Sequence, residues 1–133
     1  MSDPKVRHIN PPGLSTPRGY SHVVEASGGR TIYVAGQVAL DQHGKLIGEG
    51  DFAAQAEQVF TNLKTALAAA GADLSHVVKM TSFVRNVAEN LATLRAVRDR
   101  HLPVPPPANT LIEINRLVQD NLLLEIEAVA VVP

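Results

Sequence analysis

The sequence predicts a single α+β domain in which two helices pack on one face of a mixed sheet. Three observations predict this class: an alternating apolar pattern near the C-terminus, two stretches with helical periodicity, and β-rich segments on both sides of those stretches. The predicted order of elements is ββ(β)αβαββ over residues 1–133. A chain of 133 residues is long enough to bury a core of its own, so no second domain is expected.

The N-terminal third is predicted to contain an arm, a hairpin and a short further strand. Residues 1–17 are polar and rich in proline, which indicates an arm that either covers a site or stays solvated. Strand-forming residues at 20–25 and 31–35 flank a glycine-containing turn at 27–30, and this pattern is typical of a hairpin. A short segment at 45–47 is the optional third strand.

Two later segments have the spacing of amphipathic helices, with a predicted strand at 77–84 between them. Asp51 is a favourable N-cap for the first helix, and Gly71 lies where a glycine commonly ends a helix. The apolar stripe of this helix contains Ala56, Val59, Phe60, Leu63, Leu67 and Ala70. The second helix is predicted from about 88 to 101, because the prolines that follow end it and begin an extended segment.

The last quarter of the chain predicts a second hairpin, in which strand-forming residues at 110–118 and 122–132 flank a polar connector at 119–121. One face of the final strand is entirely apolar: Leu122, Leu124, Ile126, Ala128 and Ala130. The opposite face combines Glu125 and Glu127 with leucine and valine. Plain solvent does not explain such a mixture, which favours contact with a second subunit and a part-buried polar site.

Composition excludes several classes of function. The net charge of −1 and the aromatic content of 4% argue against a nucleic-acid partner. The absence of cysteine excludes disulfides and thiolate chemistry, and the five histidines lack metal-ligand spacing, so no metal site is expected. No glycine pattern indicates a nucleotide cofactor, and no cofactor is predicted. Without an apolar signal core or membrane-spanning run, we expect a cytoplasmic protein with no membrane partner.

Four segments, in the same order along the chain, resemble the RidA/YjgF family, some members of which are labelled L-PSP endoribonuclease. They are 33–38, 55–71 with 77–81 after it, 83–84 and a C-terminal signature that joins Pro107-Ala108-x-Thr110 to 125–130. The resemblance covers nearly the whole chain. It implies a fold similar to the chorismate-mutase trimer, with three sheets around a central barrel. It also implies that a homotrimer binds small molecules in clefts between subunits.

The resemblance also implies a set of site residues. Tyr20 matches a cleft tyrosine, Gly36 matches a glycine whose backbone approaches the ligand, and Glu125 matches the glutamate that positions or activates water. Deaminating members bind the substrate carboxylate through an arginine that is replaced here by Asn109. Asparagine donates hydrogen bonds but lacks the charge of a guanidinium. Arg95, on the second predicted helix, is a candidate substitute for that charge.

Other interpretations of three of these residues stay open. Arg95 could belong to a solvated basic face with Arg98 and Arg100. Tyr20 is equally compatible with a strand edge, and Gly36 with a strand bulge.

The two glutamates of the final strand have an alternative of their own. Either could pair with Arg116 or Lys79, across the sheet or across an interface. We prefer the ion pair for Glu127 and the ligand cleft for Glu125.

Two classes of function follow from the sequence. If the protein is an enzyme, we expect hydrolysis of an imine or enamine to a carbonyl and ammonia, with water oriented by Glu125. The replacement at Asn109 favours instead a non-catalytic ligand-binding or regulatory trimer, or a hydrolase for another class of carbonyl or imine substrate. Neutral charge and few aromatic residues disfavour the ribonuclease activity reported for some relatives.

Overall fold

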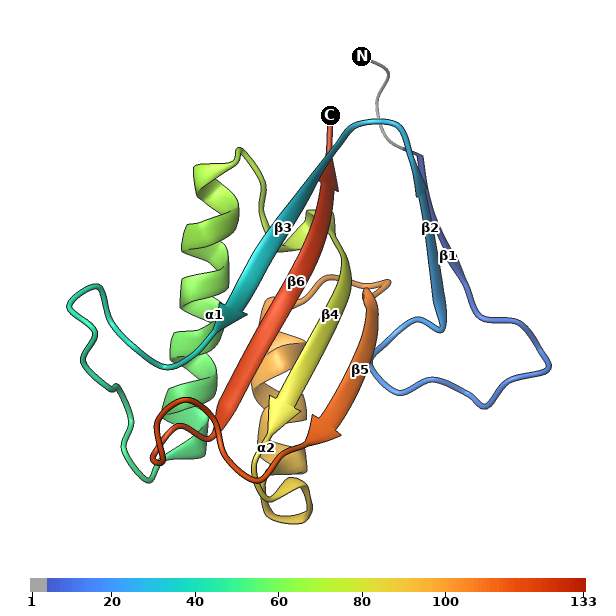
Figure 1. Ribbon diagram of the computed structural model, residues 1–133. Helices are drawn as coiled ribbons and strands as arrows, with labels where there is room; N and C mark the ends of the chain where they lie inside the picture. Colours follow the sequence, from blue (N-terminus) through green and yellow to red (C-terminus); the bar gives the residue numbers. More distant parts are fainter. Residues whose placement is uncertain (1–4) are drawn as a thin grey trace.

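The computed structural model describes residues 5–133 and has the predicted order of elements with one additional N-terminal strand (Figure 1). The strands are β1 (Lys5–Ile9), β2 (Val23–Ser27), β3 (Arg30–Gln37), β4 (Val77–Val84), β5 (Ala108–Glu113) and β6 (Leu124–Val132). The helices are α1 (Phe52–Ala69) and α2 (Val87–His101), with a 3-10 turn at Leu74–His76. The segment predicted as an optional strand contributes a single bridge, between Leu40 and Leu46.

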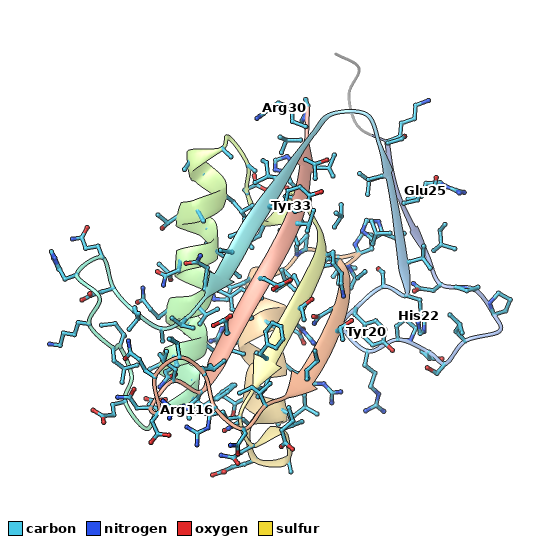
Figure 2. All side chains as sticks on the ribbon, viewed as in Figure 1. Tyr20, His22, Glu25, Arg30, Tyr33 and Arg116 are labelled. Atoms are coloured by element: carbon cyan, nitrogen blue, oxygen red, sulfur yellow. The ribbon has the colours of Figure 1, made fainter. Side chains whose placement is uncertain are left out.

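The main sheet has the strand order β3-β6-β4-β5, with β6 antiparallel to both of its neighbours and β5 parallel to β4. Both helices lie against one face of this sheet (Figure 1), so the predicted α+β class is confirmed. The apolar face of the last strand is buried beneath them, and its residues are at most 3% exposed: Leu122, Leu124, Ile126, Ala128 and Ala130. The opposite face carries Tyr33, which is 80% exposed (Figure 2).

Both predicted hairpins are wrong. β5 does not pair with β6, because β4 lies between them and the connecting residues 114–123 cross the end of β4. β2 pairs with β1 and not with β3, so β1 and β2 form a separate two-stranded ribbon. The periodicity of a sequence identifies a strand but not its partner, and these predictions assumed that consecutive strands are neighbours.

The predicted N-terminal arm is therefore partly a strand. Residues 5–9 form β1, whose Arg7 donates from Nε to Glu25 Oε1 on β2 at 3.0 Å. Residues 10–17 follow as irregular structure, and residues 1–4 of the predicted arm lie outside the described residues.

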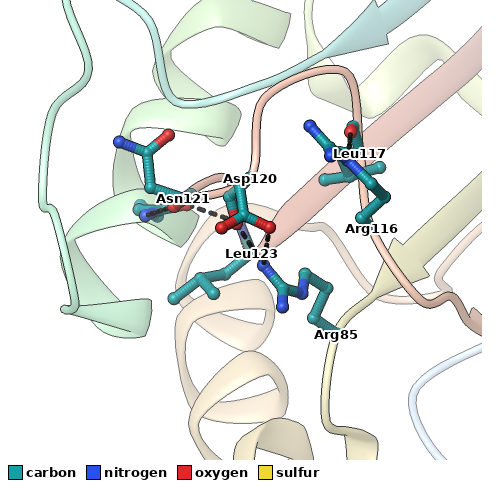
Figure 3. Close-up of polar contacts among 7 residues, drawn as sticks. Arg85, Arg116, Leu117, Asp120, Asn121 and Leu123 are labelled. Carbon is teal, nitrogen blue, oxygen red and sulfur yellow. Dashed lines mark hydrogen bonds and ion pairs between the residues drawn. The ribbon is translucent and has the colours of Figure 1, made fainter.

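The connector between β5 and β6 is held by a buried glutamine on α1. Gln55, which is 0% exposed, donates to the carbonyl oxygen of Asn121 at 3.0 Å and accepts from the Leu123 amide at 2.8 Å. Arg85, beyond the end of β4, donates to the carbonyl oxygen of Asp120 (Figure 3). These contacts fix the entry into β6 and hence the register of Glu125.

The ends of α1 match the sequence prediction. Asp51 Oδ1 accepts from the Ala54 amide at 3.1 Å, and Gly71, with φ of +75°, closes the helix. α2 begins one residue earlier than predicted, and Glu113 Oε1 of β5 accepts from the Val87 amide at 2.9 Å. Among residues 5–133, neither helix combines the length and the apolarity that crossing a bilayer requires.

Candidate functional site

The segment between β1 and β2 carries Tyr20 to the edge of the main sheet. The neighbouring Ser21 is buried, donates its amide to the carbonyl oxygen of Pro107 at 3.0 Å, and forms a parallel bridge with Ala108. The rings of Tyr20 and His22 meet edge to face, with centroids 5.3 Å apart (Figure 2). These contacts position Tyr20 beside the beginning of β5.

A cavity of about 320 Å³ lies between this segment, α2 and β5. We call it the arginine cavity, and its lining residues are Arg18, Tyr20, Leu91, Arg95, Arg98, Asn109, Thr110 and Leu111. It brings together three of the five predicted site residues, Tyr20, Arg95 and Asn109, although they are distant in sequence. A small ligand in this cavity would meet a phenol, an amide and several guanidinium groups.

Arg98 is a cavity residue that the sequence prediction missed. Its placement on a solvated basic face is wrong, because Arg98 is only 6% exposed. Its Nε lies 3.4 Å from Asp99 Oδ1, and its guanidinium packs against Gly19. Arg95 is half-buried, whereas Arg100 is exposed. The three-residue spacing of Arg95 and Arg98 on one helix was the signal that could have placed both on one face.

Asn109 lies on the face of β5 that is directed toward α2. Its register partner on β4 is Met80, which is 1% exposed beneath the helices, and paired residues of neighbouring strands share a face. Ser82 Oγ donates to Asn109 Oδ1 at 3.4 Å. With its oxygen occupied in this way, Asn109 has its amide nitrogen available as a hydrogen-bond donor to a ligand.

Positive charge exceeds negative charge around the arginine cavity. Its lining contains three arginines and no carboxylate. Within the part of the chain that the structure describes, Arg18 and Arg95 form no ion pair, and Arg98 pairs only with Asp99. Guanidinium groups bind carboxylates through charge-assisted hydrogen bonds. The electrostatics of the cavity therefore favour an anionic ligand.

The remaining two candidates, Gly36 and Glu125, contact one another on β3 and β6. A Cβ built at Gly36 would lie 2.7 Å from Cδ of Glu125, so a side chain at position 36 would require this carboxylate to move. The pairing of the two strands is irregular between Val34 and Gln37, in agreement with a bulge at Gly36. Glu125 is half-buried and lies opposite Phe83 of β4, on the sheet face away from the helices.

Ion pairs across the sheet, which were the alternative roles for the two glutamates, are absent among residues 5–133. Lys79 donates to the Thr110 hydroxyl at 2.8 Å, and Arg116 donates to a backbone carbonyl at 3.1 Å. Glu127 is exposed. Neither carboxylate is therefore neutralised within the described chain.

The two groups of candidate residues do not converge within one chain. Glu125 on β6 and Asn109 on β5 are separated by β4, a lateral distance of roughly 10 Å, and their side chains lie on opposite faces of the sheet. Gly36 lines a different cavity, of about 670 Å³, which contains neither Tyr20, Arg95 nor Asn109. A ligand in the arginine cavity is out of reach of Glu125 from the same chain.

Comparison with known proteins gives a consistent family relationship. The family model described as Endoribonuclease L-PSP matches residues 13–132. Protein DfrA of Myxococcus xanthus is 37% identical over 112 residues, which is 84% of each chain. The 2-iminobutanoate/2-iminopropanoate deaminase of Dermatophagoides farinae is 32% identical over 127 residues, 95% of this chain and 96% of that protein. A crystal structure of a Rid family protein of unknown function from Yersinia pestis is 40% identical, covers 96% of this chain and 98% of that chain, and has a TM-score of 0.85.

Proposed function

Because the chain belongs to the Endoribonuclease L-PSP family, which includes the RidA/YjgF proteins, we propose that it hydrolyses the imine or enamine form of a small carboxylic acid. The products are the corresponding 2-oxo acid and ammonia. The observation that carries the proposal is the convergence of Arg95 and Asn109 in the arginine cavity. Arg95, on α2, thereby supplies the positive charge that deaminating members of the family carry on an arginine at the position of Asn109.

The substrate carboxylate is bound by Arg95 and Asn109 together. The guanidinium of Arg95 contributes charge and paired donors, and the amide nitrogen of Asn109 contributes a neutral donor. Tyr20, on the other side of the cavity, packs its ring against the substrate chain.

Hydrolysis moves both protons of one water molecule to the imine nitrogen. Glu125 accepts the first proton as the water oxygen bonds to the carbon of the C=N bond, and returns it to nitrogen, so that a neutral carbinolamine forms. Glu125 then accepts the hydroxyl proton of the carbinolamine and delivers it to the amino group, and the C–N bond breaks with release of ammonia as the C=O bond forms. The reaction involves no redox change, so it needs no redox cofactor.

The distance between Glu125 and the arginine cavity requires two subunits in this mechanism. We propose a homotrimer in which the open sheet face of one subunit approaches the arginine cavity of the next. Exposed apolar groups on that face support an interface: Tyr33 is 80% exposed and Ile112 is 40% exposed. The half-buried Phe83 and Glu125 lie on the same face, so an interface there would bury an apolar surface and bring a carboxylate to the cleft.

A non-catalytic ligand-binding trimer is the second candidate function. The observation that favours it is that the lining of the arginine cavity contains three arginines but no side chain suited to act as a general base. A cavity of this kind retains an anion without converting it. The two candidates differ in whether Glu125 is needed for a reaction.

An assay of imine hydrolysis separates the two candidates. An amino-acid oxidase generates 2-iminobutanoate in the presence of semicarbazide, and the rate of semicarbazone formation reports the imine that escapes hydrolysis. We expect the protein to suppress this rate and Glu125→Gln to lose about 100-fold or more of the activity. Glu127→Gln is the matched control, because Glu127 is an exposed glutamate on the same strand face. An inactive protein that still binds 2-oxobutanoate would establish the non-catalytic candidate instead.

A further inference from the structure

We propose that the arginine cavity selects a dicarboxylate, namely a 2-imino acid that carries a second carboxylate on its side chain. This inference rests on the proposed function, because it names the substrate class of the same site. Neither the replacement at Asn109 nor the family relationship requires it. It follows from the number and the placement of the charges in the cavity.

The count of charges exceeds what one carboxylate neutralises. Arg18, Arg95 and Arg98 line the cavity, and the single carboxylate paired with any of them is Asp99, among the residues that the structure describes. Two guanidinium groups, those of Arg18 and Arg95, are left without an acidic partner in residues 5–133. Clustered like charges repel, so a ligand with two negative charges gains more from this cavity than a monoanion.

The two unpaired guanidinium groups come from different elements. Arg95 is on α2, whereas Arg18 is on the segment that leads to Tyr20. Arg95 and Asn109 form the subsite for the carboxylate adjacent to the reacting carbon. Arg18 then meets the far end of the ligand, where a second carboxylate would lie. Cations on separate walls suit two separated carboxylates better than one compact dianion such as phosphate.

The third arginine of the cavity, Arg98, is buried and held by its own contacts. Arg98 is 6% exposed, and its guanidinium is fixed between Asp99 and Gly19. It contributes positive potential from within the wall, and Asp99 offsets part of it. The cavity, at about 320 Å³, is near the lower end of the range for ligand sites. Its size therefore agrees with a small acid rather than with a nucleotide or a peptide.

Affinity measurements with two matched oxo acids test this inference. 2-Oxoglutarate and 2-oxopentanoate have the same number of carbon atoms, but only the first has a second carboxylate. We expect calorimetry at low ionic strength to give a dissociation constant about tenfold or more lower for 2-oxoglutarate. Equal affinities for the two acids would overturn the inference. So would tighter binding of inorganic phosphate than of 2-oxoglutarate, because phosphate would then be the preferred dianion.

Substitution of Arg18 tests the assignment of the second subsite. Arg18 is exposed on an irregular segment, so Arg18→Gln is expected to fold. This substitution should raise the dissociation constant of 2-oxoglutarate about tenfold and change that of 2-oxopentanoate by less than about twofold. Arg30→Gln is the control, because Arg30 is an exposed arginine outside the cavity and should leave both affinities unchanged. An unchanged preference for 2-oxoglutarate in Arg18→Gln would contradict the assignment.

A failure of the dicarboxylate preference can be distinguished from a failure of the proposed hydrolysis. A protein that prefers 2-oxoglutarate but does not hydrolyse the imine of glutamate retains the dicarboxylate site and loses the proposed reaction. A protein that hydrolyses imines of monocarboxylic and dicarboxylic amino acids equally well retains the reaction and overturns the dicarboxylate preference.

Discussion

The guanidinium of Arg98 packs against the backbone of Gly19, and a Cβ built at Gly19 would lie 2.7 Å from Cζ of Arg98. Gly19 also has a φ of +73°, a conformation that favours glycine. This contact joins the segment that carries Arg18 and Tyr20 to helix α2. Gly19 is therefore a point at which two walls of the arginine cavity contact each other.

Substitution of Gly19 is expected to disrupt the cavity. Gly19→Ala should displace the Arg98 guanidinium, weaken binding of 2-oxoglutarate about tenfold or more, and lower the free energy of unfolding by about 1 kcal/mol. Calorimetry and urea denaturation measure the two effects. Gly13→Ala is the matched control, because a Cβ at Gly13 meets nothing within 4 Å. Unchanged binding in Gly19→Ala would show that the Arg98 contact does not shape the site.

The contact between Gly36 and Glu125 predicts a separate effect on the reaction. Gly36→Ala should push the Glu125 carboxylate from its position, because the new Cβ would lie 2.7 Å from Glu125 Cδ. We expect a loss of imine hydrolysis of about 100-fold with 2-oxobutanoate binding unchanged, since Gly36 does not line the arginine cavity. Full activity in this variant would argue against Glu125 as the proton acceptor. Ala35→Ser, at the exposed neighbouring position, serves as the control.

The buried Gln55 predicts the largest effect on stability. In addition to its two contacts with the β5–β6 connector, its Nε2 donates to the carbonyl oxygen of Gly48 at 3.1 Å. Gln55→Leu preserves volume but leaves three backbone groups without their partner. We expect the free energy of unfolding to fall by about 3 kcal/mol. Gln119→Leu, on the exposed connector, should change it by less than about 0.5 kcal/mol. Similar denaturation midpoints for the two variants would refute the role of Gln55.

Glu57 of α1 predicts a dependence of stability on pH. The hydrogen bonds from Arg100 and His101 of α2 hold the pKa of Glu57 below its ordinary value. A carboxylate with a depressed folded-state pKa stabilises the fold above its unfolded pKa, about 4.3, and loses that stabilisation as the pH falls through the folded-state value.

Glu57→Gln should therefore lower the free energy of unfolding by about 1 kcal/mol at pH 7, a modest value because the side chain is 41% exposed. The difference from wild type should shrink steadily as the pH is lowered below about 4. Denaturation curves from pH 7 to pH 3 measure it. A difference that stays constant over this range would exclude the carboxylate charge as its cause.

The sequence predicted which residues form each strand and helix better than which strands pair. The alternation in 122–130 and the stripe of α1 predicted the buried faces, because those patterns depend only on the local period of each element. The pairing of β5 with β4 rather than with β6 depends on where the connector 114–123 runs. That path is fixed by long-range contacts such as those of Gln55, which no local pattern contains.

The candidate site was predictable in the same limited way. Tyr20, Arg95 and Asn109 were identified from the sequence, and the structure brings them to one cavity. Arg18 and Arg98 were not identified, because their position depends on the packing of the N-terminal segment against α2. The homotrimer and the catalytic role of Glu125 stay predictions.

The most direct test of the central claim is the dissociation constant of 2-oxobutanoate for wild type, Arg95→Ala and Arg100→Ala. Arg100 is the matched control because it lies on the same helix but is exposed and outside the arginine cavity. If Arg95 supplies the charge expected at position 109, Arg95→Ala should raise the dissociation constant about tenfold or more, and Arg100→Ala should leave it unchanged. An unchanged constant in Arg95→Ala would contradict the claim that α2 provides the carboxylate-binding charge.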